Sequence, residues 1–112
     1  MAFQLWLLYA RKPSGEVWLC KRPASGIWAG LYCLPSFDSR EALAGAVGAR
    51  ARERLTDEAA FTHVLTHRDL HIHPVRLQLK SASPGVLPGA WHKPGALRDI
   101  GLPAPVRKLL EA

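Results

Sequence analysis

The side chains best suited to chemistry lie in and just after one short stretch, His63-Val-Leu-Thr-His67. Four of the five histidines fall between His63 and His73, and Thr66 stands among them. A threonine hydroxyl both donates and accepts hydrogen bonds, whereas arginine and lysine only donate. An imidazole exchanges a proton near neutral pH and is a common metal ligand. The stretch therefore suggests either recognition of a hydrogen-bonding ligand or a metal site.

A metal site would need further ligands beside the histidines. His71 and His73 would share one face of a strand, but no cysteine or carboxylate stands at a familiar ligand spacing, and Zn²⁺ prefers four ligands. Cys20 and Cys33 are too far apart for a Cys-x-x-Cys pair and too few for a disulfide framework. We therefore expect half-exposed strand histidines, no metal in this chain, and a reducing, cytoplasmic location.

The composition is that of one folded domain, residues 1–112, with 48% hydrophobic and 21% charged residues. Fifteen lysines and arginines against nine acidic residues leave a net charge of +6, which favours a polyanionic partner such as DNA or RNA. The basic residues are scattered in short groups, so any patch must be assembled by folding. The apolar start lacks a basic leader and is too short to span a bilayer, so we expect no membrane association.

The first elements predict a buried hairpin. Residues 3–9 are nearly all apolar, residues 12–15 (Lys-Pro-Ser-Gly) are a strong turn signal, and residues 17–21 resume a strand. An unbroken apolar run is typical of a strand that is buried on both faces. Ser39 is expected to cap a helix that begins at Arg40 and extends as far as Leu55.

Strands are expected again at residues 61–65 and 71–79, and Pro74 favours an edge or a bulge. Trp91 anchors a last short strand. A closing helix is opened by Pro103 or Pro105, with its apolar face inward and Arg107 and Lys108 outside. This order predicts a mixed sheet with helices packed on it, an α+β fold or α/β/α sandwich.

Three stretches then resemble a single family when they are taken together. They are the segment KRPASGIWAGLYCLP at residues 21–35, His63–His67, and Trp91 followed by GLPAPVRKLL at residues 101–110. In this order and spacing they are similar to the C-terminal, Nudix-like domain of bacterial adenine DNA glycosylases of the MutY type. The resemblance covers nearly the whole chain and implies a Nudix-like mixed sheet flanked by helices.

The resemblance also implies a role. Such enzymes remove adenine mispaired with 8-oxoguanine in base excision repair. In them an N-terminal helical domain with a 4Fe–4S cluster cleaves the N-glycosyl bond of the adenine, and the C-terminal domain detects the 8-oxoguanine. We thus expect a non-catalytic C-terminal part of a longer glycosylase, without a cofactor of its own, since two cysteines cannot ligate a cluster that needs four. Its expected partners are duplex DNA with an 8-oxoguanine:adenine mispair and the catalytic domain.

The family's recognition motif, commonly Phe-Ser-His, stands here as Leu65-Thr66-His67. 8-Oxoguanine carries a proton on N7 and an oxygen at C8, where guanine has an N7 acceptor. A hydroxyl suits this altered edge, so Thr66 keeps the essential group, whereas Leu65 loses the aromatic face for stacking. His67 and Arg68 could face phosphate or base. The candidate DNA-binding residues are therefore Leu65, Thr66, His67 and Arg68.

Two rival functions remain open. A Nudix hydrolase needs a helix presenting several glutamates to Mg²⁺, but the best register offers only Glu53 and Asp57 and places Ala44 where the upstream glutamate belongs. A protein-binding module would use exposed aromatic residues, and Trp28, between Gly26 and Gly30, is the tryptophan most open to such contacts.

Overall fold

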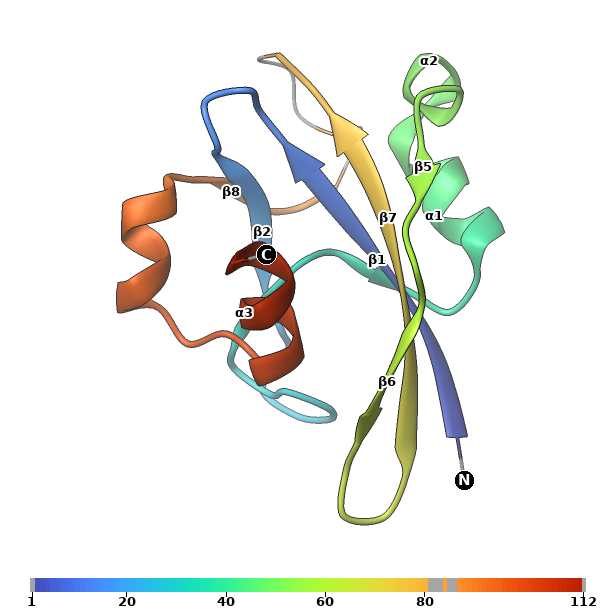
Figure 1. Ribbon diagram of the computed structural model, residues 1–112, viewed down its shortest axis with the longest axis vertical. Coiled ribbons are helices and arrows are strands. Elements are labelled where there is room, and N and C mark those ends of the chain that lie inside the picture. Colours follow the sequence, from blue (N-terminus) through green and yellow to red (C-terminus); the bar gives the residue numbers. More distant parts are fainter. Residues whose placement is uncertain (1, 81–83, 85–86, 112) are drawn as a thin grey trace.

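The computed structural model describes residues 2–80, 84 and 87–111 and shows a mixed β-sheet with helices on both faces (Figure 1). No helix in these ranges is long and apolar enough to cross a membrane. In chain order the elements are β1 (Ala2–Arg11), β2 (Val17–Lys21), β3 (Tyr32–Cys33), β4 (Ser36–Phe37), α1 (Arg40–Val47), α2 (Ala49–Arg52), β5 (Thr56–Asp57), β6 (Phe61–Val64), β7 (Asp69–Gln78), β8 (Ala90–His92), the 3-10 helix η1 (Pro94–Asp99) and α3 (Ala104–Glu111).

The centre of the sheet is the parallel pair of β1 and β7. The two strands stay in register over their full lengths, from Ala2 opposite Asp69 to Arg11 opposite Gln78. The strand order β3-β2-β1-β7-β5 places them inside the sheet, with β6 also paired to β7 and β8 to β2. The second half of the apolar run of β1, residues 7–10, is therefore buried on both faces as its composition predicts, whereas Phe3 and Gln4 at its start are exposed.

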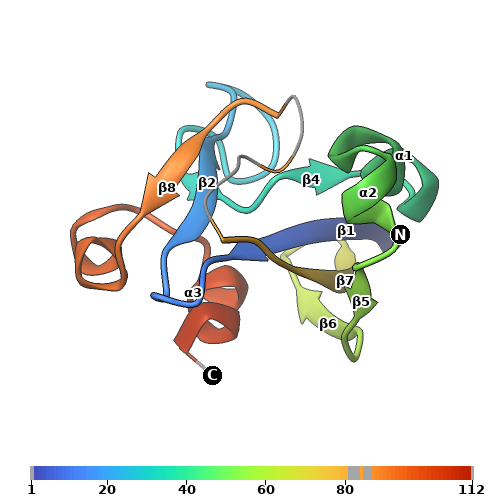
Figure 2. The same ribbon diagram turned by 90° about the horizontal axis from the view of Figure 1, so that it is seen from above.

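Alternate side chains of the central strands feed two cores. On the face covered by α3, called here the α3 face, Leu7, Tyr9, Leu70 and Ile72 pack with Val106. On the opposite α1 face a second cluster gathers around the first helix. It comprises Leu8, Ala10, Trp18, Leu43, Val47, Val75, Leu77 and Leu79. Figure 2 shows α1 and α2 on one side of β1 and β7 and α3 on the other, which confirms the expected layered α+β fold.

The first helix is shorter than predicted. Ser39 caps it as expected, since its hydroxyl oxygen accepts a hydrogen bond from the amide of Ala42 at 3.1 Å. The helix ends at Val47 because Gly48 adopts φ 88°, outside the helical region, and Leu55 lies beyond the short α2. The prediction of a continuous helix to Leu55 was therefore wrong. Glycine lowers helix propensity only moderately, but Gly48 takes a positive φ here and ends the helix.

Pro74 was expected at an edge or a bulge, and the second alternative is confirmed. β7 is an interior strand, but between the pairs Asp57–Val75 and Phe61–Ile72 the neighbouring strand has one extra residue. The carbonyl oxygen of Pro74 accepts from the amide of Glu58 at 2.9 Å, in the short segment between β5 and β6. β6 pairs with β7 up to Ile72, and β5 resumes the pairing at Val75. The proline, which has no amide hydrogen to donate, thus stands where the neighbouring strand is interrupted.

Arg107 differs from its expected outward position. Its guanidinium donates hydrogen bonds to the carbonyl oxygens of Leu97 at 3.2 Å and Ile100 at 2.9 Å. Arg107 is half-buried, whereas Lys108 is exposed as expected. The arginine thereby joins α3 to the end of η1. The spacing of apolar residues along the helix could not predict these bonds, because their acceptors are backbone oxygens of another segment.

Gly89 and Gly45 allow a matched test of the packing. A Cβ at Gly89, which has φ 133°, would lie 2.5 Å from the carbonyl oxygen of Leu19 and 2.7 Å from Trp18 Nε1, whereas one at Gly45 in α1 would meet nothing within 4 Å. We expect Gly89→Ala to lower the free energy of unfolding in urea by more than ~1 kcal/mol and Gly45→Ala to raise it by about 0.5 to 1 kcal/mol. Equal stabilities of the two variants would contradict this packing.

Candidate nucleic-acid interface

The four candidate residues form one tight turn between β6 and β7. Val64 pairs with Asp69, and the amide of Leu65 donates to the carbonyl oxygen of Arg68 at 2.8 Å, which closes the loop. Thr66 and His67 lie at its tip and are exposed. In Figure 1 this 65–68 turn projects beyond the rest of the molecule at one end of the long axis. The structure therefore brings the predicted residues together at a protruding, accessible point.

The two outer residues of the turn face the protein body. Leu65 is half-buried and packs against the hydrophobic cluster of the α3 face. The guanidinium carbon of Arg68 lies 4.5 Å from the centre of the Phe3 ring, a cation–π contact with the start of β1. Leu65 and Arg68 anchor the turn from both sides, which leaves Thr66 and His67 to meet a ligand.

The base of the turn is held by the central strand pair. Phe3 lies opposite Leu70 and Ala2 opposite Asp69, so the first residues of β1 run alongside the start of β7. Leu70 is fully buried. A turn built on such a base is positioned by the sheet itself rather than by a long loop, so its exposed groups are pre-oriented.

The histidines that precede and follow the turn occupy two different faces. On the α1 face, His71 Nδ1 lies 3.0 Å from the hydroxyl of Thr62, and His73 is hydrogen-bonded to Gln4 and stacks on Trp6 at 4.4 Å between ring centres. These are half-exposed strand histidines, as predicted. Across residues 2–80, 84 and 87–111, no group of three His, Cys, Asp or Glu side chains is placed to hold a metal ion.

His63 instead lines a cavity of about 330 Å³ on the α3 face, between β6 and α3. Phe61 and Leu109 supply apolar walls and Lys108 a charge. No local pattern indicates this cavity, because its two sides are more than forty residues apart in the chain and meet only when α3 packs on the sheet.

The two carboxylates available for a Mg²⁺ site do not stand together with further acidic groups. Asp57 accepts a hydrogen bond from Arg40 Nε at 2.9 Å, and this bond raises the pKa of the Arg40 guanidinium. Ala44, in the place of the upstream glutamate, is buried. Glu53 is exposed at the end of α2. An arginine thus neutralises the carboxylate that a cation would need.

Cys33 is buried and Cys20 half-buried, and neither surrounding favours the reactive thiolate. Cys20 lies opposite Cys33 in the β2–β3 pair, and both are free thiols. Burial raises the pKa of both groups, that of Cys33 to about 12, although the nearby Arg22 opposes the shift. Since the thiolate is the nucleophile, neither residue is suited to catalysis at neutral pH.

Trp28 is less available for partner contacts than its glycine neighbours suggest. It is half-buried against the cluster of the α3 face, with φ 56° in a loop that Arg22 braces by donating to the carbonyl oxygen of Ile27 at 3.3 Å. The tryptophan has a packing role there.

Comparison with protein families gives one match over nearly the whole chain. A family model described as NUDIX domain matches residues 6–112. Two curated relatives from different strains of Buchnera aphidicola are named adenine DNA glycosylase, and each is 30% identical to this chain. Each alignment covers 89% of the chain but 30% of the relative, so the chain spans less than a third of the length of these proteins.

Solved structures share the fold. The C-terminal domain of mouse MUTYH, in its complex with human PCNA, superposes with a TM-score of 0.74 at 21% identity, covering 96% of this chain and 84% of that one. The NUDIX domain of Shewanella oneidensis NrtR, complexed with ADP ribose, gives 0.71 at 11% identity, covering 99% and 85%. These similarities confirm the expected arrangement of a mixed sheet flanked by helices.

The contact of Arg68 with Phe3 can be tested directly. Phe3→Leu keeps an apolar side chain but removes the ring, so we expect a loss of stability of about 0.5 to 1 kcal/mol. The Leu65 amide should also exchange its hydrogen faster, because the closing bond to Arg68 loosens, whereas amides in the centre of β7 should not change. Unaltered exchange at Leu65, measured by NMR, would show that the ring does not hold the turn.

Proposed function

The chain belongs to the NUDIX domain family, and within that family we propose that it is the lesion-recognition domain of an adenine DNA glycosylase. In this role it reads 8-oxoguanine opposite adenine in duplex DNA. The observation that carries the proposal is the exposed pair Thr66–His67 on a turn anchored at both sides. The relatives named adenine DNA glycosylase support the same assignment.

Thr66 is the residue proposed to discriminate the oxidised base. N7 of 8-oxoguanine donates a hydrogen bond that the Thr66 hydroxyl oxygen can accept, and the same hydroxyl can donate to the new oxygen at C8. Normal guanine has an acceptor at N7 and nothing at C8 to receive the bond. A well-formed contact of this kind contributes about 1 to 3 kcal/mol of discrimination.

Leu65 and Arg68 are proposed to position the turn rather than read the base. Leu65 is turned toward the cluster of the α3 face and Arg68 toward Phe3, so stacking on a base falls to neither in this arrangement. His67, exposed beside Thr66, is suited to a phosphate or base contact. The turn acts as a hydrogen-bonding reader on a stiff support.

Bond cleavage is assigned to the remainder of the proposed glycosylase. A 4Fe–4S cluster requires four cysteine ligands, and Cys20 and Cys33 are the two in this sequence, so the cluster does not fit this chain and is expected in an N-terminal catalytic domain. Together the two domains would hold a mispaired duplex in the bacterial cytoplasm, the catalytic domain acting on adenine and this one on its partner.

The proposed discrimination predicts a specific change in the complete enzyme. Thr66→Ala should reduce the preference for 8-oxoguanine:adenine over guanine:adenine duplexes by roughly 5- to 150-fold, since the hydroxyl contact is lost. Relative dissociation constants for the two duplexes are the measurement.

Two further variants control this experiment. Thr66→Ser keeps the hydroxyl and should retain most of the preference, whereas Thr56→Ala removes an exposed threonine from β5 and should leave it unchanged. A Thr66→Ala enzyme that discriminates like the wild type would show that the side chain is not the reader.

The rival function, hydrolysis of an oxidised nucleotide, is tested separately. With Asp57 bound to Arg40 and a buried Ala44 in the helix, we expect no release of pyrophosphate when the chain is incubated with Mg²⁺ and 8-oxo-dGTP. Turnover that Glu53→Gln abolishes would establish a hydrolase instead.

A further inference from the structure

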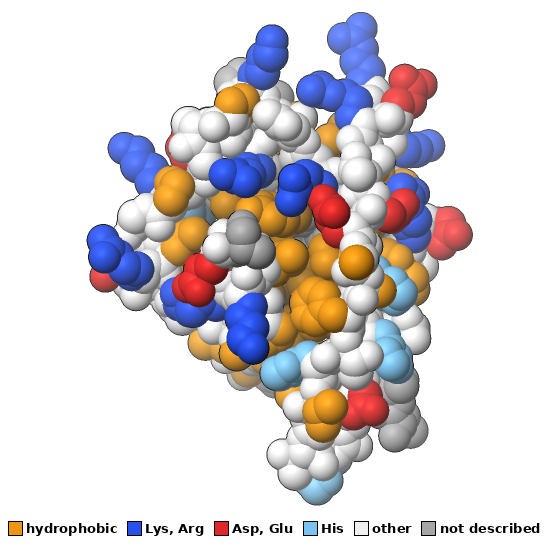
Figure 3. Space-filling view, viewed as in Figure 1, with side chains coloured by type: hydrophobic (Ala, Val, Ile, Leu, Met, Phe, Trp, Pro, Cys, Tyr) orange, Lys and Arg blue, Asp and Glu red, His pale blue; other side chains and the backbone are white. Residues whose placement is uncertain are grey.

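The 65–68 turn supplies little of the positive charge that DNA binding requires. Most of the affinity of proteins for DNA comes from cations placed against phosphates. Arg68 is the sole lysine or arginine of the turn, and it is held over Phe3. Figure 3 shows lysine and arginine side chains on the middle and the opposite end of the visible face instead. A duplex read at the turn must therefore gain phosphate contacts elsewhere.

A basic pocket at that opposite end provides candidate contacts. This pocket has a volume of about 240 Å³ and lies where β1 and β7 end. Its lining residues are Arg11, Lys12, Pro13, Arg76 and Gln78. Tyr9 belongs to the core of the α3 face, and Arg11, two residues further along the strand, points to the same side. The pocket thus opens on the face that also carries the His63 cavity.

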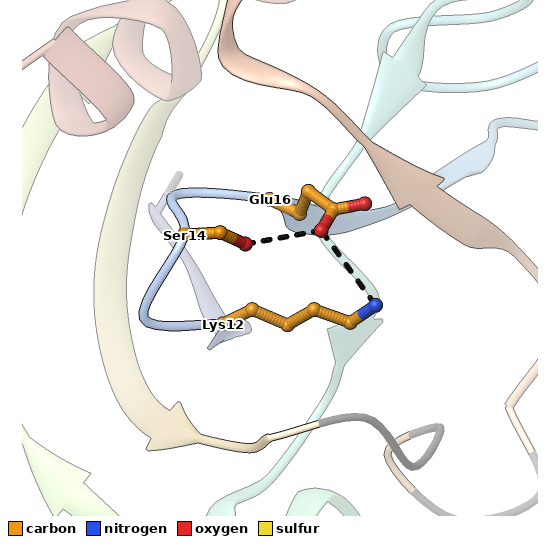
Figure 4. A network of polar contacts seen from close by, with 3 residues as sticks. All are labelled: Lys12, Ser14 and Glu16. Carbon is orange, nitrogen blue, oxygen red and sulfur yellow. Dashed lines mark hydrogen bonds and ion pairs between the residues drawn. The ribbon is translucent and has the colours of Figure 1, made fainter.

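Two of its cations are held in place by neighbours. Figure 4 shows Lys12 reaching across the β1–β2 turn to Glu16, at 3.7 Å, while Ser14 donates to the same carboxylate at 3.0 Å. Arg76 pairs with Glu58 at 3.0 Å and lies over the Tyr9 ring. These pairs fix the side chains but neutralise part of their charge.

Arg11 carries the charge that remains. It is exposed, and among the described residues it has neither an ion pair nor a side-chain hydrogen bond. Three cations stand against the two carboxylates of Glu16 and Glu58, so the pocket keeps a net positive charge centred on a guanidinium with five free donors. A phosphate oxygen pair is the ligand that this geometry fits best.

The distance between pocket and turn matches a continuous duplex. Arg11 lies opposite Gln78, nine residue steps along β7 from Asp69, which corresponds to ~30 Å at about 3.3 Å a residue. That length equals roughly nine base pairs at 3.4 Å each. Lys108 lies on α3 beside His63, between the two places. A straight duplex along the α3 face would meet all three.

We propose that the basic pocket binds a backbone phosphate of the same duplex whose base is read at the 65–68 turn, about nine base pairs from the lesion. The position of the lesion rests on the proposed function. The pocket supplies affinity that does not depend on sequence, and the turn supplies discrimination.

The test uses the 112-residue chain and duplexes with a central 8-oxoguanine:adenine pair, in lengths of about 10 and about 24 base pairs. Dissociation constants are measured by fluorescence anisotropy from low to moderate salt. On the long duplex Arg11→Gln should weaken binding and reduce the slope of log affinity against log salt by about 0.9, which corresponds to one lost phosphate contact. On the short duplex, which ends before the pocket, it should behave as the wild type.

Arg50→Gln is the matched control, because it removes the same charge from α2, on the α1 side of the sheet. It should leave both slopes unchanged. Three results would each overturn the proposal: an unchanged slope for Arg11→Gln on the long duplex, an equal loss of affinity on both lengths, or no binding even at low salt. The first of these would point to an acidic protein as the partner. If the wild type ignores the lesion while Arg11→Gln still lowers the slope, the phosphate site stands and the proposed function fails.

Discussion

The parallel pairing of β1 with β7 is the constraint on which the rest of the structure depends. Parallel strands are typically buried on both faces. Residues 7–10 of β1 are buried on both, and α1 and α3 cover these faces, while β7 alternates buried apolar residues with more exposed ones. The pair also fixes the ends of the sheet: one end carries the 65–68 turn and the other carries Arg11 and Arg76.

Under the proposed function, the separation of these ends divides two tasks that a DNA-binding domain must perform. Discrimination requires a few neutral or polar groups held close to a base edge, whereas affinity requires cations against phosphates. A cation at the tip would donate equally well to the acceptors of normal guanine and so reduce selectivity. The structure holds Arg68 over Phe3 and exposes Thr66, which suits a reader whose affinity is supplied elsewhere.

Features encoded by neighbouring residues could be predicted from the sequence, whereas those that depend on distant contacts could not. The cap at Ser39, the buried first strand and the closing helix follow from local patterns and are present. The four candidate residues come from one contiguous motif, so their meeting in a single turn was foreseeable. The roles of Arg107 and Arg68 were missed, since backbone carbonyls and a ring more than sixty residues away leave no local signal. Pro74 indicated an edge or a bulge but could not show which, because the bulge lies in the adjacent strand.

That bulge has a mechanical consequence. Between the end of β5 and the start of β6, one hydrogen bond, from Glu58 to Pro74, replaces a continuous ladder along the outer side of β7. Strain passes through packed, hydrogen-bonded networks. Twisting of the β6–β7 hairpin is therefore poorly transmitted past this point along the edge formed by β5 and β6. The pairing of β7 with β1 continues without a break past the same point. It is therefore the β1 side that holds the hairpin in line with the rest of the sheet.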